Sequence, residues 1–237
     1  MQVIRAVGLI SIAASLLAGC GGGGGGGGAD TSPPTANPTV TSTNARTAWR
    51  SLLATTRVAT ASGLGSDSAT YQLSLTIQPL GSVTSNGVRM QAIGFTSVLT
   101  RNSLANNSAT SNLYVLDSTG VPSAYVEPPN DCALFTGGSE PPLLAALGQS
   151  GPLYSGTLGS ISFGCSLTFN GTVSGTWQVQ SEGPSTFFCV TARRQGFVST
   201  ESQESCIEVT DAAGTLGARV RFTLTQGSAS PLVLRNY

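Results

Sequence analysis

Most of the chain after residue 69 has the two-residue period of half-buried β-strands. Between residues 71 and 77, Tyr71, Leu73, Leu75 and Ile77 alternate with polar side chains. Because successive side chains of a strand point to opposite faces, this pattern predicts an antiparallel strand with one face in a core. Similar segments recur to the C-terminus, and about eight to ten strands are expected. The pattern predicts a mainly β fold, either an antiparallel β-sandwich or a partly closed β-barrel, and does not decide between them.

Turn residues set the expected register of these strands. Asn86-Gly87 is typical of a tight hairpin turn, and a change of phase in the next strand predicts a bulge near Gly94. Alternating apolar residues over 160–180 predict a further hairpin. A three-residue loop at 169–171 would place Leu167 opposite Val173 and keep all apolar side chains on one face.

Residues 45–60 are expected to form one short N-terminal helix. Asn44 or Thr43 can cap it, and one face has apolar spacing, with Trp49, Leu52, Leu53 and Thr56. Three arginines lie mostly off that face: Arg46, Arg50 and Arg57. The helix is expected to pack its apolar face on the domain; a basic helix lying on anionic lipid is the alternative.

The N-terminus has the sequence pattern expected of an export signal. One positive charge, Arg5, precedes an apolar stretch at 6–18, which is short for a membrane-spanning helix but suits a signal peptide. The stretch ends in Leu17-Ala18-Gly19-Cys20. This sequence resembles the lipobox of bacterial lipoproteins, in which an apolar residue and two small residues precede the cysteine. The resemblance covers residues 1–20.

The resemblance implies cleavage after residue 19 and lipidation of Cys20 with a diacylglycerol and an amine-linked acyl chain. The membrane is then a partner through this anchor, which far exceeds the marginal hold of a single acyl chain. Residue 21 is Gly rather than the Asp that retains family members at the inner membrane. The expected location is therefore the bacterial cell envelope, with the outer membrane favoured over the inner.

A tether is expected to follow the anchor. Residues 20–44 combine the lipidated cysteine with eight glycines and a Pro/Thr/Ser-rich stretch that has too little apolar surface to fold. As a flexible coil this segment would span roughly 27 Å. Residues 45–237 are then expected to be a single β-rich domain.

Composition excludes much familiar chemistry. The 237 residues contain no His and no Lys, so neither a Ser-His relay nor a lysine Schiff base can form. Eleven acidic and eleven basic residues leave no net charge, which argues against a nucleic-acid partner. No cofactor is expected.

Four cysteines besides Cys20 predict two disulfides in an oxidising compartment. Of the three possible pairings we favour Cys189–Cys206, which flank a polar loop, and this leaves Cys132–Cys165. A metal site is not expected, because the chain has neither histidine nor a CxxC motif.

Acidic residues are the remaining candidates for catalysis. Two groups lie close in sequence: Glu127, Asp131 and Glu140, and Glu201, Glu204 and Glu208. A converging carboxylate pair could hydrolyse glycosides. The string Asp117-Ser-Thr-Gly120 has a faint similarity to an aspartic protease motif, but it is better explained as a turn.

These observations favour a lipid-anchored, non-enzymatic binding or structural module with an envelope protein or polymer as its partner. A carrier of small apolar ligands is the first alternative and would require a large cavity. A carboxylate-dependent hydrolase is the second and would require two acids in a cleft with a raised pKa.

Overall fold

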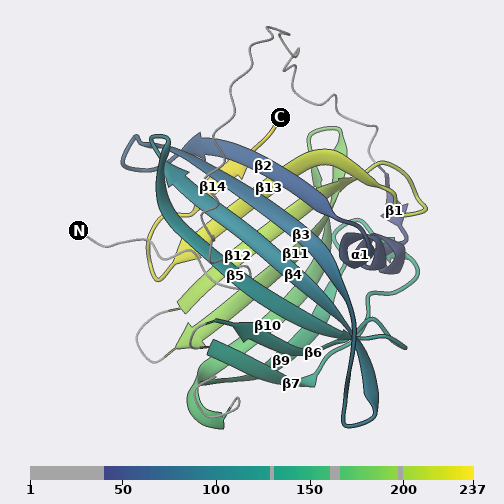
Figure 1. Cartoon of the computed structure of the whole chain (residues 1–237). Helices are drawn as coiled ribbons and strands as arrows, with labels where there is room; N and C mark the ends of the chain where they lie inside the picture. The colour runs from purple at the N-terminus through teal and green to yellow at the C-terminus, as the bar shows by residue number, and fades with distance from the viewer. Residues whose placement is uncertain (1–39, 129–130, 161–165, 197–199) are drawn as a thin grey trace, which may run out of the picture.

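The computed structural model describes residues 40–128, 131–160, 166–196 and 200–237 (Figure 1). The first half contains β1 (Ser42–Thr43), α1 (Ala45–Ala54), β2 (Arg57–Leu64), β3 (Thr70–Ser85), β4 (Val88–Arg101), β5 (Leu104–Leu116), β6 (Pro122–Glu127) and β7 (Asp131–Gly137). The second half contains β8 (Ala145–Ala146), β9 (Ser150–Ser160), β10 (Ser166–Glu182), β11 (Ser185–Gly196), β12 (Thr200–Val209), β13 (Leu216–Gln226) and β14 (Leu232–Arg235).

The described strands form a closed barrel rather than a sandwich. Twelve of them, β2–β7 and β9–β14, make a continuous antiparallel ladder in which β14 pairs with β2 to complete the ring (Figure 1). Short β1 and β8 form a separate two-stranded sheet. The prediction of a mainly β fold with one short helix is confirmed, and the closed ring resolves the choice between sandwich and partly closed barrel.

The inward face of the barrel is the core. The alternation predicted in β3 is confirmed, because Tyr71, Leu73, Leu75 and Ile77 are all buried in one apolar cluster. The opposite strands contribute Phe188 and Phe222 to the same cluster. The two-residue period therefore identifies the inward face of β3.

The helix is shorter than predicted. It begins after Asn44, whose side chain accepts a hydrogen bond from the Thr47 backbone N–H at 2.9 Å, and it ends at Ala54. Arg57 starts β2, which pairs with β3 from Arg57↔Ile77 onward. β-branched side chains at residues 55–60 favour the strand, and the free ladder edge of β3 gives it a partner.

The bulge predicted near Gly94 lies on the facing strand instead. Pairing between β3 and β4 shifts at Leu80, between Pro79↔Ile93 and Gly81↔Ala92. The proline has no N–H to donate, which favours an irregularity at this point of the ladder. The Asn86-Gly87 turn is confirmed, with both residues at positive φ.

The hairpin predicted over residues 160–180 is wrong. β10 runs without a turn through Asn170-Gly171, and Val173 pairs with Gly156 of β9 and Arg194 of β11. Residues 161–165 lie outside the described residues. Gly171 adopts φ 139° at a shift in the ladder with β9, so this dipeptide marks an irregularity within the strand rather than its end.

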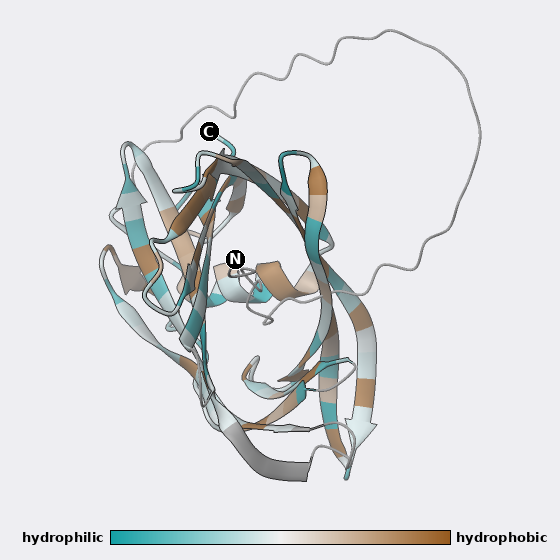
Figure 2. Ribbon diagram, turned by 90° about the vertical axis from the view of Figure 1, so that its left-hand side faces the viewer, coloured by the Kyte–Doolittle hydropathy of each residue, from teal (hydrophilic) through white to brown (hydrophobic). Residues whose placement is uncertain are grey.

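Helix α1 fills one end of the barrel (Figure 2). Trp49, Leu52 and Leu53 are buried in the same cluster as the inward-facing strand residues. The Trp49 indole N–H donates to the Gly120 carbonyl at 2.9 Å, which ties the helix to the turn between β5 and β6. This packing contradicts the alternative of a basic helix lying on lipid. Among the described residues, no helix is long and apolar enough to span a membrane.

A polar cluster lies inside the barrel at the end away from α1. Arg194 of β11 forms ion pairs with Asp131 and, at 3.5 Å, with Glu127, and the Tyr125 hydroxyl donates to Glu127. Burial together with the Glu127 charge raises the pKa of Tyr125 well above its ordinary value. The phenol therefore stays protonated and acts as a donor within this end of the barrel.

Replacing Trp49 tests the role of the helix. Trp49→Ala removes the largest side chain of α1 and its hydrogen bond, and we expect a loss of about 3–5 kcal/mol in the free energy of unfolding. Leu104→Ala is the control, because Leu104 is 75% exposed and its truncation should change stability by less than about 0.5 kcal/mol. Urea unfolding of both variants is monitored by the circular dichroism of the backbone, a signal that does not depend on the tryptophan that is removed. Equal stability of the two variants would contradict the role of α1 as part of the core.

Candidate functional site

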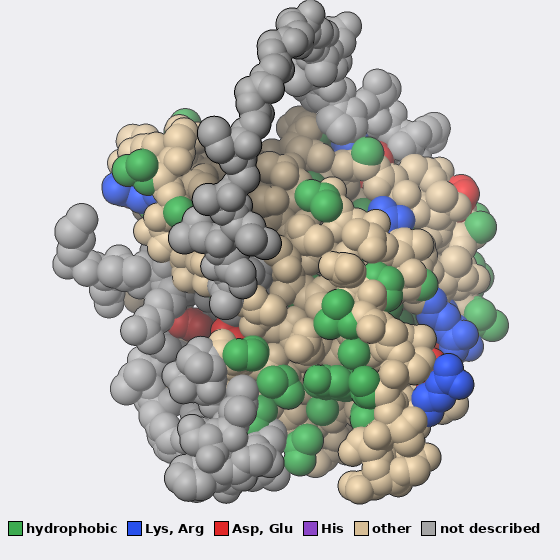
Figure 3. All heavy atoms as spheres, in the orientation of Figure 1, with side chains coloured by type: hydrophobic (Ala, Val, Ile, Leu, Met, Phe, Trp, Pro, Cys, Tyr) green, Lys and Arg blue, Asp and Glu red, His purple; other side chains and the backbone are tan. Residues whose placement is uncertain are grey.

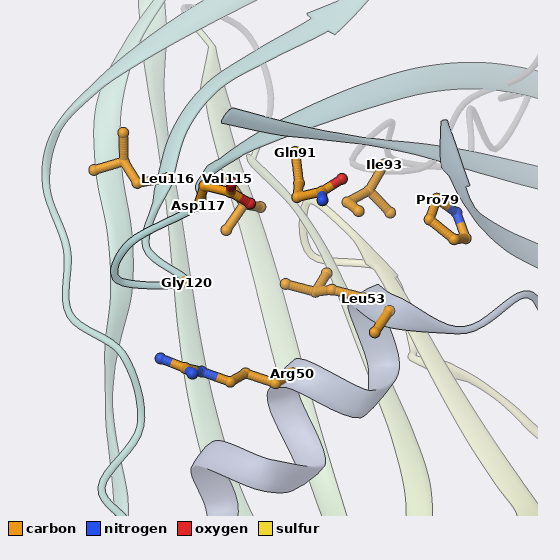
Figure 4. A pocket seen from close by; sticks show the side chains of 10 residues that line it. Arg50, Leu53, Pro79, Gln91, Ile93, Val115, Leu116, Asp117 and Gly120 are labelled. Carbon is orange, nitrogen blue, oxygen red and sulfur yellow. The ribbon is translucent and has the colours of Figure 1, made fainter. Parts of the chain in front are cut away.

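A pocket opens at the barrel end that holds α1 (Figure 4). We name this 260 Å³ hollow the mouth pocket. Leu53, Ile93 and Val115 give it an apolar lining, while Arg50 and Asp117 lie at its polar side. Arg50 is paired with Glu140, and Asp117 is paired with Arg89 at 2.9 Å. The mouth pocket thus offers apolar surface, and both of its charges are already neutralised.

The interior of the barrel holds a second, much smaller cavity. It has a volume of about 60 Å³ and lies between α1 and the strand walls, against Trp49, Phe95, Tyr154 and Phe188. Burial raises the pKa of Tyr154, so its phenol is neutral. A drug-sized ligand needs a pocket of about 300 Å³ or more. This cavity is therefore too small for such a ligand.

A third cavity, which we name the side pocket, lies in the barrel wall between β2 and β13. Its volume is about 350 Å³. Most of its lining is apolar and comes from inward-facing positions, including Leu75, Ile77, Val220 and Phe222. Arg57 is the one charged residue among the residues that line it.

Arg57 is a half-buried arginine of the described chain. Its Nε is buried without a hydrogen-bond partner, as are the Nε atoms of Arg219 and Arg221, and burial lowers the pKa of the Arg57 guanidinium. Within the described residues no acid pairs with it. Arg194, Arg219 and Arg221, by contrast, each contact a carboxylate.

The outer face of β10–β14 carries a dense charge cluster, which we name the wall cluster. Arg221 contacts Glu182 and, at 2.7 Å, Glu204, and Arg235 contacts Glu182 at 2.8 Å. Burial by itself raises the pKa of Glu182, but hydrogen bonds from Arg221, Tyr237 and Arg235 outweigh it and leave the pKa below its usual value. Glu182 is therefore held as an ionised carboxylate.

A second buried group adjoins the wall cluster. Glu208 is only 1% exposed and accepts a hydrogen bond from the Ser185 hydroxyl at 2.8 Å, while Arg219 donates to that hydroxyl at 2.6 Å. The Arg219 guanidinium also lies over the Tyr237 ring, 3.8 Å from its centre. These contacts fix the outer face of β11–β13 and hold its charges in pairs.

The disulfide expected between Cys189 and Cys206 is present. The two residues are direct partners in the β11–β12 ladder, with Cα atoms 4.0 Å apart, and both are fully buried. Cys132 is also disulfide-bonded, and its expected partner Cys165 lies outside the described residues. Glu204 lies near the first pair, but bonded sulfurs have no thiolate to offer a metal ion.

The acidic groups expected from the sequence are divided among separate parts of the described structure. Glu140 binds α1 through Arg46 and Arg50, whereas Glu127 and Asp131 lie inside the barrel around Arg194. Residues 201, 204 and 208 divide between the two faces of β12. Among the described carboxylates, each resolved pKa shift is downward: those of Asp67, Glu182 and Asp211.

The string Asp117-Ser-Thr-Gly120 is the turn between β5 and β6. The Gly120 N–H donates to the Leu116 carbonyl at 2.8 Å, and Gly120 has a positive φ of 68°. Its contribution is structural, because the Gly120 carbonyl accepts the Trp49 hydrogen bond. The lipidation residue Cys20 lies outside the described residues.

Sequence reasoning missed Arg57 as a site residue because it placed Arg57 on the helix. The available signal was the period of two over residues 57–63, where Arg57 alternates in phase with Ala59, Ala61 and Gly63. Small inward residues beside one charge are typical of a strand that lines a cavity.

No protein family, curated protein or solved structure matches this chain. Functional inference therefore rests on the geometry of the barrel and its pockets.

A pH titration of stability tests the wall cluster. A carboxylate with a lowered pKa stabilises the fold above the unfolded pKa of about 4.3, and this contribution is lost as pH falls through the folded pKa. Glu182→Gln should therefore cost about 1–3 kcal/mol at pH 7, with the difference from wild type shrinking below about pH 4. Glu201→Gln, which removes a carboxylate bonded to Gln226, is the control. A pH-independent loss would show that charge is not the cause.

Proposed function

We propose that this chain is a lipid-anchored cell-envelope protein whose β-barrel is a non-enzymatic binding module. The observation that carries the proposal is the state of the ionisable groups. Among the described residues, the acids proposed for catalysis lie at separate places and each has a partner there: α1, the barrel interior, the wall cluster, and the side chains of Ser185 and Gln226. Such contacts hold the carboxylates in fixed positions within a rigid scaffold.

The hairpin of β3 and β4 supports a macromolecular partner. Its outer part extends past the barrel wall, toward the lower right of Figure 1. It presents Leu80, Val83 and Val88 with 54%, 39% and 47% of their surfaces exposed. Arg89 is the one charged residue between residues 79 and 94, and it is paired with Asp117 at 2.9 Å. Figure 3 shows hydrophobic side chains gathered on the lower part of this face, with basic side chains at its right edge. Exposed apolar groups on a projecting hairpin are typical of a contact site.

A carrier of small apolar ligands is the second candidate. The cavity beside α1, at about 60 Å³, is too small for such a ligand. The side pocket, at about 350 Å³, is large enough for a small molecule and keeps this function in consideration.

The anchor is tested by changing its acceptor. Cys20→Ser removes the thiol that would carry the diacylglycerol, so we expect the protein to move from the membrane to the soluble fraction of the envelope. Membrane and soluble fractions of intact cells are compared by immunoblot, with Cys132→Ser as a control for loss of a cysteine alone. Tight membrane association of the Cys20→Ser chain would rule out lipid anchoring.

The partner is tested by site-specific photocrosslinking in intact cells. A photoreactive residue replacing Val83, at the projecting hairpin, should capture one envelope protein or polymer at high yield. The control position is Leu104, which is 75% exposed in the turn at the other end of β4. Mass spectrometry identifies the product. Equal capture at both positions, or none at either, contradicts a specific partner at the hairpin.

A further inference from the structure

The side pocket exists because β14 completes only part of the barrel wall. β14 pairs with β13 over residues 221–224 and meets β2 at Arg235↔Ser62. The remaining part of β2, residues 57–61, therefore has no β14 partner and lies across a gap from the start of β13. The pocket occupies this gap and takes lining from both strands.

The edge of β13 at the gap is satisfied without another strand. The Asn236 side chain accepts a hydrogen bond from the Val220 N–H at 2.8 Å and donates to the Ala218 carbonyl at 2.9 Å. An amide side chain here takes the place of a ladder partner. The backbone groups of β13 that border the gap are therefore hydrogen-bonded within the chain, and this side of the gap is held in position.

Arg57 makes this gap favourable for an anionic ligand. Its guanidinium has five N–H donors, and the buried Nε has no partner within the described chain. Arg57 is half-buried in the lining of a mostly apolar pocket and has no acidic partner within the described chain, so an anion that enters the pocket would pair with it. A planar carboxylate matches the guanidinium fork best.

We propose that the side pocket binds a small amphipathic carboxylate, with its anionic head on Arg57 and its apolar body against Leu75, Ile77 and Phe222. Taking about 30 Å³ for each non-hydrogen atom, the volume of about 350 Å³ accommodates about twelve of them. A ten-carbon fatty acid has this size. The proposal specifies the ligand of the carrier alternative and is independent of the lipid anchor and of any macromolecular partner.

Three ten-carbon probes separate the contributions of head and tail. Decanoate, decanol and decyltrimethylammonium are titrated below their micellar concentrations into the full-length Cys20→Ser chain, and heats of binding are measured by calorimetry. This chain lacks an acyl group of its own to compete for the pocket. Decanoate should bind at least about tenfold more tightly than decanol, since a charge-assisted hydrogen bond supplies that difference. Binding of decanol as tight as that of decanoate would overturn the role of Arg57.

Two variants locate the binding. Arg57→Gln should weaken decanoate at least about tenfold and leave decanol unchanged. Arg193→Gln is the matched control, because Arg193 is an exposed arginine and its loss changes the net charge equally. Ala218→Leu fills the pocket from an exposed position and should weaken both ligands. Decanoate affinity that is unaffected by Arg57→Gln and Ala218→Leu would place binding elsewhere and overturn the proposal.

Thermal unfolding separates lost binding from lost folding. Without ligand, Arg57→Gln should have an unchanged or higher Tm than wild type, because it removes a charge that burial disfavours. With decanoate, the Tm should rise for wild type and Arg193→Gln but not for Arg57→Gln. A ligand-free Tm well below wild type would show that Arg57 supports the fold and would contradict its assignment to ligand binding.

Discussion

Closure of the ring by β14 is the constraint on which the rest of the structure depends. A sheet of this kind leaves two edges, and an uncovered edge exposes unpaired backbone groups. β14 joins those edges with four residues, meeting β2 at Arg235↔Ser62. The short strand makes the ring continuous at one end and leaves the side pocket at the other. Packing and the proposed binding chemistry therefore have the same origin.

Helix α1 solves a problem that a wide barrel creates. An eight-stranded barrel is just narrow enough for its side chains to fill, and the diameter grows with strand number. Twelve strands leave more space than inward-facing side chains can occupy. Trp49, Leu52 and Leu53 of α1 occupy one end of the lumen, and the Arg194 cluster occupies the other. Between α1 and the strand walls, the described cavity has a volume of only about 60 Å³.

The sequence predicts well which side chains of the strands face inward, because apolar and polar residues alternate where one face of a strand is buried. Val220, Phe222 and Leu224 face inward as expected, and Arg221 lies on the outer face. The Cys189–Cys206 disulfide is also predictable from the sequence, because two cysteines that flank a polar loop are easily brought opposite each other. These features depend on residues close together in the chain.

The failures depend on pairing between distant strands. Asn170-Gly171 has the composition of a turn, but β9 and β11 on either side extend β10 through it. Residues 57–60 lie close after the helix in the sequence, but they form a strand because they pair with β3. The side pocket combines β2, β3, β12 and β13, and no local pattern indicates which strands meet across a barrel.

The charge clusters have a consequence for the conditions in which the molecule works. Arginine remains protonated far above neutrality, and the chain has no histidine, the side chain that ordinarily titrates between pH 5 and 8. The described cysteines are bonded and do not titrate. In the wall cluster, the lowered pKa of Glu182 and the raised pKa of Arg221 therefore keep this ion pair charged across that range. The pair presents the same charges to its surroundings whether they are mildly acidic or mildly alkaline.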